Sequence, residues 1–575
     1  MKQVVHQVDL CVVGGGLAGM SAAIAAARGG AKVVLMHERP VLGGNASSEV
    51  RMWICGAHGE NNRETGIIEE IELENLYRNS EKTYGIWDSV LYEKVRFQEN
   101  LSLLLNCSCC DLEMKGEEIE SVRGWQQTTQ TWHRVKAKLF ADCSGDSVLA
   151  PLSGALYRVG REARAKFDED IQPEKADQHT MGMSCLIQAR ETTSPQPFIP
   201  PSWAYKYLSD DDLPHRGHGL KLWSTNFWWI ELGGDQDSIH DTEEVRDELL
   251  KIAYGVWDHI KNHGDHGAEN WVLDWVGFLP GKRESRRYVG DYILTQSDVR
   301  AEGRFEDLVA YGGWTMDDHH PQGFNYPGEP TIFHPAPSPF GIPYRCLYSK
   351  NIGNLFFAGR NISVTHAALS ATRVMATCAT IGQAVGTAAA IAIAHDLSPR
   401  GVYEEKLGEL KQQLQDDDCY LPWNKRQVPK LSLEANLTAS EGDPEPLRSG
   451  VDRPVGDEDQ SWVGEFGSWV EYRFAKPEKI RELRFVFDSD FNRKEKNMPA
   501  SFPLEFEPHR VPKTLVRAFR IEVEQDGEWE QVLKIEDNYQ RLARLSLDLE
   551  ASAVRFVPVS TWGSEKVRVF AWDLA

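Results

Sequence analysis

Three glycines near the start of the chain constrain its fold more than any other feature. Gly14, Gly16 and Gly19 follow an apolar run at residues 8–13 and open a segment of helical composition. A second apolar run follows that segment and ends at Glu38, nineteen residues after Gly19. A strand, a glycine-rich turn, a helix and a second strand make up the βαβ unit that holds the pyrophosphate of a dinucleotide. The pattern therefore predicts an α/β, Rossmann-like domain with a dinucleotide site.

Each residue of this turn has a separate expected task. Gly14 makes the turn, Gly16 lets the backbone approach the pyrophosphate, and Gly19 allows the helix to pack closely on the strand. Leu17 and Ala18 stand in the first turn of the helix, where amide groups face the phosphates. Glu38 is expected to accept hydrogen bonds from the ribose hydroxyls.

Glycines beyond the second strand favour FAD over NAD as the dinucleotide. Gly43 and Gly44 follow Glu38, and a glycine pair at this place resembles the flavoprotein pattern in which the chain turns back along the cofactor. Two later strand-like runs, 138–142 and 354–358, end in polar glycine turns of the kind that contact FAD. Besides the residues of the first turn and Glu38, the expected cofactor contacts are Arg39, Gly43, Gly44, Asn45, Ser144, Gly145, Asp146, Gly359, Arg360, Met375 and Thr377.

Residues 1 to about 400 resemble the FAD-dependent oxidoreductase family with the glutathione-reductase-type nucleotide fold. Segments 281–295, 339–345 and 358–386 are similar to family blocks. The resemblance implies FAD as cofactor and leaves the substrate open. Cys143–Ser144 departs from the Ala-Thr pair of many relatives, a small exchange that does not threaten cofactor binding.

The pattern of runs and turns predicts several domains. We expect residues 1–154 and 336–400 to form the FAD-binding domain, with an inserted α+β substrate domain at 155–335 that is rich in tryptophan, Trp223 among them. Residues 401–429 read as a helix and linker. Residues 430–575 read as an all-β sandwich, which resembles galactose-binding-like domains of the discoidin type. The tryptophans could stack on sugar rings or fill a core equally well.

Candidates for chemistry lie near the late glycine turn. His366 follows Gly359–Arg360 by a few residues and is the first choice for proton transfer, with a purely structural histidine as the alternative. Arg373 and the helix start at Met375 could stabilise negative charge on a reduced flavin. The other candidates for catalysis are His58, His320, His334 and Arg286.

Two further features leave alternatives open. Cys55 and His58 are expected to contact the flavin, and a covalent bond through either is an alternative to non-covalent binding. Arg283, Arg286 and Arg287 could clamp an anionic or polyhydroxy substrate, or could simply form salt bridges.

Charge and composition exclude several classes of partner. The chain of 575 residues has 63 basic and 86 acidic side chains, a net charge of −23. Such a field repels nucleic acid and anionic membranes. The chain reaches its first glycine turn without room for a signal peptide and lacks an apolar run of 18 residues, so a cytoplasmic protein is expected. We expect no metal site, because neither the cysteines at 107–110 nor the pair His319–His320 has zinc-like spacing.

These features predict an FAD-dependent oxidoreductase that moves a hydride between a secondary alcohol of a sugar or glycoside and the flavin. A fumarate-reductase-like ene reductase acting on a small acid is one alternative, and a flavin-bound glycan-binding or scaffold protein is another. A single nucleotide fingerprint argues against a disulfide reductase coupled to NAD(P)H. The partner that donates or accepts electrons and the state of oligomerisation stay open, with a homo-oligomer among the alternatives.

Overall fold

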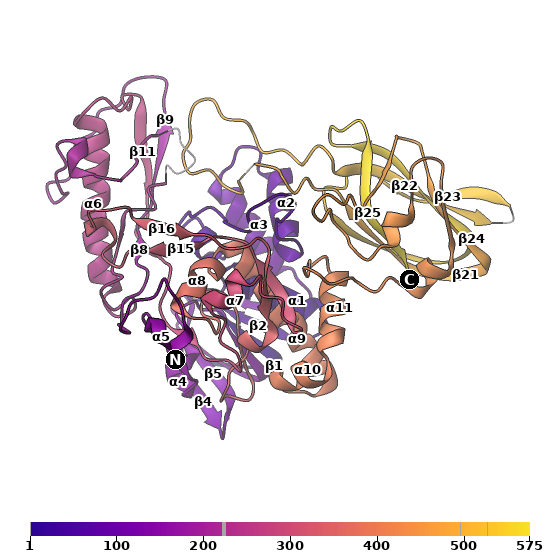
Figure 1. The fold of residues 1–575 in the computed structure, drawn as a ribbon, viewed down its shortest axis with the longest axis horizontal. Helices are drawn as coiled ribbons and strands as arrows, with labels where there is room; N and C mark the ends of the chain where they lie inside the picture. The colour runs from indigo at the N-terminus through magenta and orange to yellow at the C-terminus, as the bar shows by residue number, and fades with distance from the viewer. Residues whose placement is uncertain (1, 221–225, 495, 526) are drawn as a thin grey trace. The chain divides into compact units, whose positions relative to one another are not determined.

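The computed structural model describes residues 2–220, 226–494, 496–525 and 527–575 (Figure 1). The chain forms two compact units. The first unit consists of Met1–Ala57, Lys82–Leu410 and Lys496–Pro508, and the second consists of His58–Glu81, Lys411–Glu495 and His509–Ala575. All ten cysteines are free, as expected for a chain without a disulfide framework.

A mixed sheet forms the centre of the first unit. Its parallel strands are β3 (Leu101–Leu104), β2 (Val33–Met36), β1 (Lys2–Val13), β6 (Thr131–Asp142) and β18 (Leu355–Phe357). Strands β5 (Glu118–Gln126) and β4 (Cys107–Lys115) continue the sheet in antiparallel pairing. Val13 lies opposite both Met36 and Asp142, and Phe357 also lies opposite Asp142. The register therefore brings the turns after β1, β2, β6 and β18 to one edge of the sheet.

Two helices, α1 (Leu17–Arg28) and α9 (Met375–His395), pack closely in the first unit. A Cβ atom on Gly382 would lie 2.0 Å from the carbonyl oxygen of Ala18, and one on Gly386 would lie 2.1 Å from that of Ala22. Only glycine allows this approach. Within the described residues, α9 is the one helix long and apolar enough to cross a bilayer, but 94% of its apolar window is buried. It is a core helix of this unit.

The expected inserted domain, residues 155–335, belongs to the same compact unit as the nucleotide fold. Small sheets and the long helix α6 (Thr242–Asn262) build it. Trp257 of α6 and Trp271 lie in one hydrophobic core, so these two rings fill a core. Trp223 lies outside the described residues. The strands of this region are β7 (Tyr157–Arg158), β8 (Met183–Ser184), β9 (Ile187–Glu191), β10 (Glu231–Leu232), β11 (Trp271–Val276), β12 (Gly281–Lys282), β13 (Arg287–Tyr288), β14 (Leu308–Gly312), β15 (Met316–His319) and β16 (Thr331–His334).

Short elements complete the first unit. They are α3 (Tyr84–Arg96), α4 (Leu149–Ser153), α5 (Arg164–Phe167), α7 (Gln296–Arg300), β17 (Phe340–Pro343), α8 (His366–Thr372) and α10 (Pro399–Glu405). Helix α11 (Leu407–Asp416) carries the chain into the second unit.

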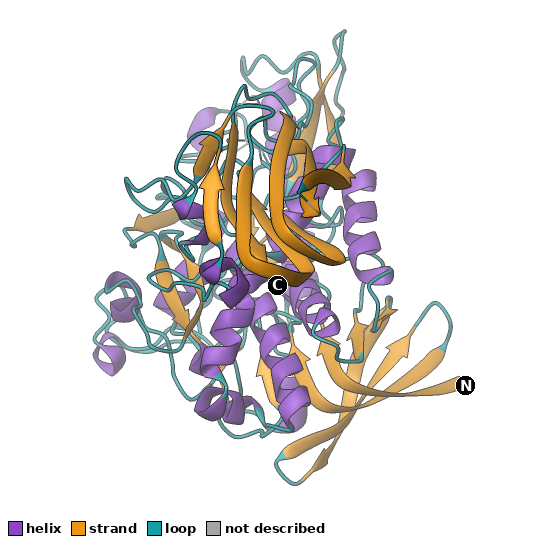
Figure 2. Ribbon diagram, turned by 90° about the vertical axis from the view of Figure 1, so that its right-hand side faces the viewer, coloured by secondary structure: helices purple, strands orange, loops and turns teal. Residues whose placement is uncertain are grey.

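The second unit is built on one antiparallel sheet, whose long curved strands are visible in Figure 2. Its strands are β19 (Asn436–Ala439), β20 (Trp462–Gly464), β21 (Val470–Phe487), β22 (Val516–Gln525), β23 (Glu528–Ile535), β24 (Leu542–Thr561) and β25 (Val567–Leu574). Phe485, Phe556 and Trp572 lie at the centre of its aromatic core. The all-β character of the C-terminal region was predicted. The described strands form one hydrogen-bonded sheet, in which β19 branches off by pairing with β21.

The boundaries of the second unit differ from the predicted ones. Helix α2 (Ile67–Arg78) belongs to it, because buried Glu69 pairs with Arg493 at 2.6 Å and accepts a hydrogen bond from Ser489 at 2.6 Å. Residues 411–429, expected as part of a helix and linker, also belong to it; the remaining helix of this unit is α12 (Lys430–Glu434). Segment 496–508 instead joins the first unit, where the backbone of Phe502 bonds to strand β9. These long-range contacts have no signal in local composition.

Candidate functional site

The first glycine turn has the shape that a dinucleotide requires. Gly14 has a φ of +104°, and a Cβ there would lie 2.4 Å from the carbonyl oxygen of Cys143. A Cβ on Gly19 would lie 1.8 Å from the carbonyl oxygen of Gly14. Around Gly16, in contrast, the nearest atom to an added Cβ is the Cα of Gly44 at 3.8 Å. Gly14 and Gly19 are therefore required by the protein itself, whereas the space beside Gly16 is open.

The second glycine turn lies against the first. The amide of Gly43 donates to the carbonyl of Gly15 at 2.9 Å, and Gly43 forms a parallel bridge with Gly16. Gly43 and Gly44 have φ values of +103° and +60°, which favour glycine. Asn45 donates from Nδ2 to the carbonyl of Lys282 at 3.1 Å, which ties this turn to β12.

Glu38 stands at the end of β2 beside a buried histidine. The Nδ1 atom of His37 accepts a hydrogen bond from the amide of Gly15 at 3.0 Å, and Nε2 donates to the carbonyl of Val41 at 2.9 Å. Burial would raise the pKa of Glu38, but the Arg39 guanidinium, 3.4 Å away, acts in the opposite direction and holds that pKa below its usual range. Glu38 is thus ionised at neutral pH, as an acceptor for ribose hydroxyls must be. The importance of His37 was not predicted.

Asp146 and Arg360, both predicted to contact the cofactor, bond to each other. Nη2 of Arg360 lies 2.6 Å from Oδ1 of Asp146, and Nζ of Lys282 lies 2.9 Å from Oδ2. Burial opposes ionisation of Asp146, but Arg360 and Lys282 hold its pKa well below the usual range. The preceding residues fit the same turn: Gly145 has a φ of +77°, and the hydroxyl of Ser144 donates to Asp142 at 2.6 Å. The cluster joins the turns after β6 and β18.

The start of α9 has no side-chain cap. Its N-cap residue is Val374, and the amide of Ala376 donates to the carbonyl of Cys55 at 3.0 Å. Met375 and Thr377 open the helix, as predicted from the sequence. Burial raises the pKa of the Cys55 thiol to about 11, so the thiol is neutral. His58 belongs to the second unit, where burial lowers its pKa.

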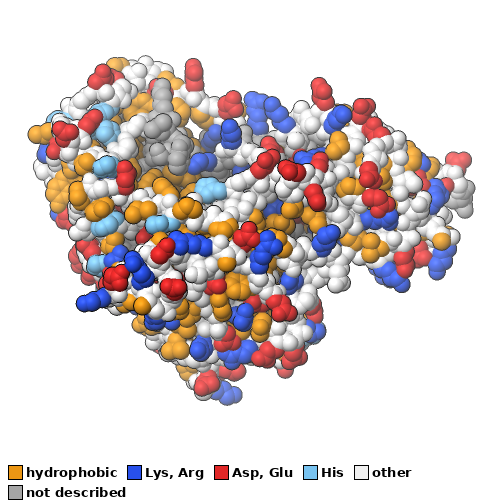
Figure 3. Space-filling view, viewed as in Figure 1, with side chains coloured by type: hydrophobic (Ala, Val, Ile, Leu, Met, Phe, Trp, Pro, Cys, Tyr) orange, Lys and Arg blue, Asp and Glu red, His pale blue; other side chains and the backbone are white. Residues whose placement is uncertain are grey.

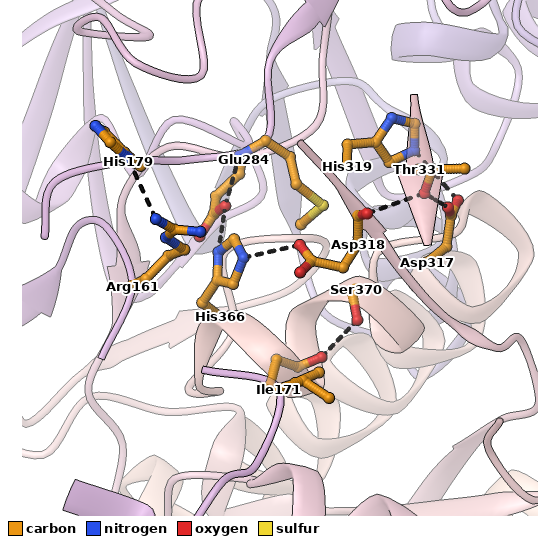
Figure 4. A network of polar contacts seen from close by, with 12 residues as sticks. Arg161, Ile171, His179, Glu284, Asp317, Asp318, His319, Thr331, His366 and Ser370 are labelled. Atoms are coloured by element: carbon orange, nitrogen blue, oxygen red, sulfur yellow. Dashed lines mark hydrogen bonds and ion pairs between the residues drawn. The ribbon is translucent and has the colours of Figure 1, made fainter. Parts of the chain in front are cut away.

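His366 lies between two carboxylates (Figure 4). Its Nδ1 lies 2.8 Å from Oε2 of Glu284, and its Nε2 lies 3.1 Å from Oδ1 of Asp318. Burial opposes protonation, but the two carboxylates raise the pKa of His366 to about 10. At neutral pH the ring is therefore an imidazolium with both nitrogens engaged. A general base needs a free nitrogen lone pair, which His366 does not offer in this arrangement.

The contacts of His366 with Glu284 and Asp318 form one chain of charged side chains, and a second such chain runs beside it. Nη2 of Arg373 lies 3.1 Å from Oδ2 of Asp317, and the same oxygen lies 3.3 Å from Nε2 of His319. Nδ1 of His319 lies 2.6 Å from Glu231, which in turn lies 3.4 Å from Arg283. Asp317 and Asp318 are neighbours on β15 and point to opposite chains, because side chains alternate along a strand. Burial opposes ionisation of Asp317, but His319 and Arg373 keep its pKa well below the usual range.

The remaining predicted candidates lie outside these two chains. The Arg286 guanidinium lies over the ring of Tyr157 at 5.6 Å. His320 stacks on Tyr326 at 3.6 Å, and its Nδ1 accepts from the amide of Gln322 at 3.3 Å. His334 is half-buried on β16, opposite Met316.

Sequence reasoning missed the acidic members of both chains, Glu231, Glu284, Asp317 and Asp318. Two signals were available. Glu284 lies inside the segment 281–295 that was singled out for its arginines, and the two aspartates directly precede His319–His320.

The residues present fit FAD. The open space beside Gly16 and the uncapped first turn of α1 suit a pyrophosphate. Glu38 is an ionised acceptor at the end of the adjacent strand. The Nε atom of Arg373 is buried and has no hydrogen-bond partner within the described part of the chain, so this donor is available to a bound group.

Comparison with known proteins agrees with this geometry. The family model "FAD dependent oxidoreductase" matches residues 9–414. No curated protein matches the chain.

Solved structures resemble parts of the chain only weakly. A geranylgeranyl bacteriochlorophyll reductase-like protein from Thermoplasma acidophilum is 13% identical, with 71% of this chain and 84% of that one covered at a TM-score of 0.32. The family 32 carbohydrate-binding module of Streptococcus pneumoniae EndoD is 14% identical, with 25% of this chain and 97% of that one covered at a TM-score of 0.19. Likeness at this level carries no inference about function.

Proposed function

Because the chain belongs to the family of FAD-dependent oxidoreductases, we propose that it moves a hydride between FAD and a secondary alcohol of a neutral, hydroxyl-rich substrate such as a sugar or glycoside. FAD supplies the group that takes or returns the hydride. The observation that carries the choice of substrate class is the charge balance of the two polar chains.

Each cation in these chains is matched by a carboxylate. Arg283 pairs with Glu231, and Arg373 pairs with Asp317. The His366 imidazolium contacts two carboxylates. Arg287 also lies 3.4 Å from Glu284, so each arginine of these two chains in the described part of the protein already has a carboxylate partner. A dicarboxylate substrate would need cations free to bind it, so the balance argues against the fumarate-reductase-like alternative.

Asp318 is the member of its chain that a substrate hydroxyl can reach. Its side chain is 20% exposed, whereas those of His366 and Glu284 are 3% and 0% exposed. Burial would raise the pKa of Asp318, but the hydrogen bond and charge of His366 lower it. Asp318 is thus an ionised acceptor. Oxidation of a secondary alcohol removes a hydride from carbon and a proton from oxygen, and we assign the proton to Asp318, with His366 as its positioning residue.

The glycine turns hold the cofactor in this proposal. The first turn and the start of α1 would hold the pyrophosphate, and Glu38 would accept hydrogen bonds from the ribose hydroxyls. Arg373 and the start of α9 would stabilise negative charge on the flavin ring. The full set is Gly14, Gly16, Leu17, Ala18, Gly19, Glu38, Arg39, Gly43, Gly44, Asn45, Ser144, Gly145, Asp146, Gly359, Arg360, Met375 and Thr377.

Anaerobic bleaching of the flavin absorption band tests the proposal. The protein is mixed without oxygen with sugars, glycosides, dicarboxylates and steroids, each class in separate samples. We expect bleaching by a sugar or glycoside, and none by the matched deoxy compound that lacks the reacting hydroxyl. Bleaching by a dicarboxylate or a steroid, with none by any sugar or glycoside, would overturn the choice of substrate class and leave the family unaffected.

A further inference from the structure

Four side chains of the inserted region converge on one point. They are Asp210 at the start of a 3-10 helix (Asp210–Asp212), His218 in the next loop, His259 on α6 and His266 in the loop after α6. One ligand atom from each of the four lies within 4.8 Å of the others. Figure 3 shows histidine side chains gathered over this part of the molecule.

The carboxylate of Asp210 is the common neighbour of the three rings. Its Oδ1 atom lies 3.0 Å from Nε2 of His259, 3.6 Å from Nε2 of His266 and 3.7 Å from Nε2 of His218. Ligands at 2.0–2.1 Å from a tetrahedral zinc ion are about 3.3 Å apart. The three Oδ1–Nε2 distances are within a few tenths of an ångström of this spacing, and all four ligand atoms lie within 4.8 Å of one another.

Hydrogen bonds at the far side of two rings aim their lone pairs at the centre. Nδ1 of His259 lies 3.0 Å from the carbonyl oxygen of Tyr207, and Nδ1 of His218 lies 2.8 Å from that of Arg216. A carbonyl oxygen only accepts, so each Nδ1 carries the proton. In the neutral ring, Nε2 is then an unprotonated ligand atom, the orientation that backbone carbonyls impose on metal-binding histidines.

Without a cation this arrangement is unfavourable. In the neutral form, the Nε2 lone pairs of His218 and His259 both face Asp210, which is itself an acceptor. His218 is inclined by 87° to His259 and by 75° to His266, so it meets both rings edge to face. Nε2 of His266 also lies 3.2 Å from the carbonyl oxygen of His263. His266 would give up this contact when its Nε2 binds an ion.

We propose that Asp210, His218, His259 and His266 bind a divalent transition metal, with zinc as the best match. Three imidazoles and one carboxylate are ligands that Zn²⁺ prefers in tetrahedral coordination. With four protein ligands the site is closed, so its role is structural. It joins the loop before α6, the helix itself and the loop after it. This departs from our expectation of no metal site.

Metal titration of the full chain tests the proposal. Untagged, FAD-loaded protein is dialysed against a chelator and titrated with Zn²⁺, and with Co²⁺ to follow its visible bands. We expect one ion per chain and the intense Co²⁺ spectrum of a tetrahedral site. His218→Ala and His266→Ala should each weaken Zn²⁺ binding by about 10²-fold or more, the upper end of what losing even an outer-shell partner costs.

A matched control separates this site from adventitious binding. His240→Ala removes an exposed histidine that contacts only Asp237 among the contacts described for it, and it should bind Zn²⁺ like the wild type. The flavin spectrum of each variant reports whether the chain is folded. Absence of stoichiometric binding in the wild type, or equal affinity in the His218 and His266 variants with intact flavin spectra, would overturn the proposal.

Discussion

The Nδ1 atom of His366 lies 2.8 Å from Oε2 of Glu284, and the two side chains are only 3% and 0% exposed. With Asp318 at the other nitrogen, the ring is an imidazolium held between two carboxylates. A buried charge of this kind is stable only while its partners remain. His366 is therefore a fixed cation that shapes the site, and proton acceptance passes to Asp318.

The raised pKa of His366 makes stability depend on pH. The pKa is about 10 in the folded protein against 6.5 for an unperturbed histidine. Stabilisation from the bound proton is complete below about pH 6.5 and is lost as the pH rises toward about 10. We expect the difference in free energy of unfolding between wild type and His366→Gln to be largest at about pH 6 and to shrink toward pH 10. Denaturant unfolding at about pH 6, 8 and 10 measures it. The control His334→Gln, at a half-buried histidine, should not show this decrease between pH 6 and pH 10 in its difference from the wild type. If the difference for His366→Gln did not depend on pH, the His366 ring would be neutral.

Asp318→Asn should keep FAD bound and slow flavin reduction by about 10²–10⁴-fold, the usual contribution of a positioned acid or base. The amide retains the size of the side chain but cannot take the proton. Anaerobic stopped-flow reduction with the substrate found by the bleaching panel gives the rate. Asp396→Asn, at the exposed left-handed C-cap of α9, is the control and should leave the rate unchanged. An unchanged rate in Asp318→Asn would move proton transfer to His320 or His334.

Gly16→Val should yield a folded but colourless protein. The position has no close protein neighbour, so the side chain displaces the cofactor and not the fold. The ratio of flavin to protein absorbance measures loading, and circular dichroism measures folding. Gly85→Val on α3, where an added Cβ meets nothing within 4 Å, should stay yellow. Full FAD occupancy in Gly16→Val would refute the assignment of this turn.

A chain truncated at Lys430 should be insoluble or unstable, although the C-terminal sheet is far from the glycine turns in the sequence. Its helix α2 would keep Glu69, which is 1% exposed, without Arg493. Removing one partner of a buried ion pair costs about 3–5 kcal/mol. Soluble yield and flavin content test this expectation.

Point variants test whether the loss of the Glu69–Arg493 ion pair causes this instability. Arg493→Met in the full chain should destabilise it, and the double variant Glu69→Gln with Arg493→Met should recover part of the loss because the uncompensated charge is gone. Thermal unfolding measures both. A soluble, fully yellow truncated chain would show that α2 does not depend on the sheet.

The nucleotide turn could be predicted because its requirements are local. Gly14 needs a positive φ, Gly19 needs close packing, and Glu38 follows at the end of a strand, all within one βαβ unit. Backbone conformation and short-range spacing are encoded residue by residue, so FAD follows from the sequence alone. The alternation of residues in the C-terminal region likewise indicated its strands.

Only the tertiary structure decided which charged groups meet. Glu284, Asp318 and His366 come from three segments, as do Asp210, His218 and His259, and each set depends on the register and packing of distant elements. Whether a histidine is a base, a fixed cation or a metal ligand depends on the carboxylates and carbonyls around it. The sequence therefore determined the cofactor, and long-range packing decided the chemistry of the residues around it.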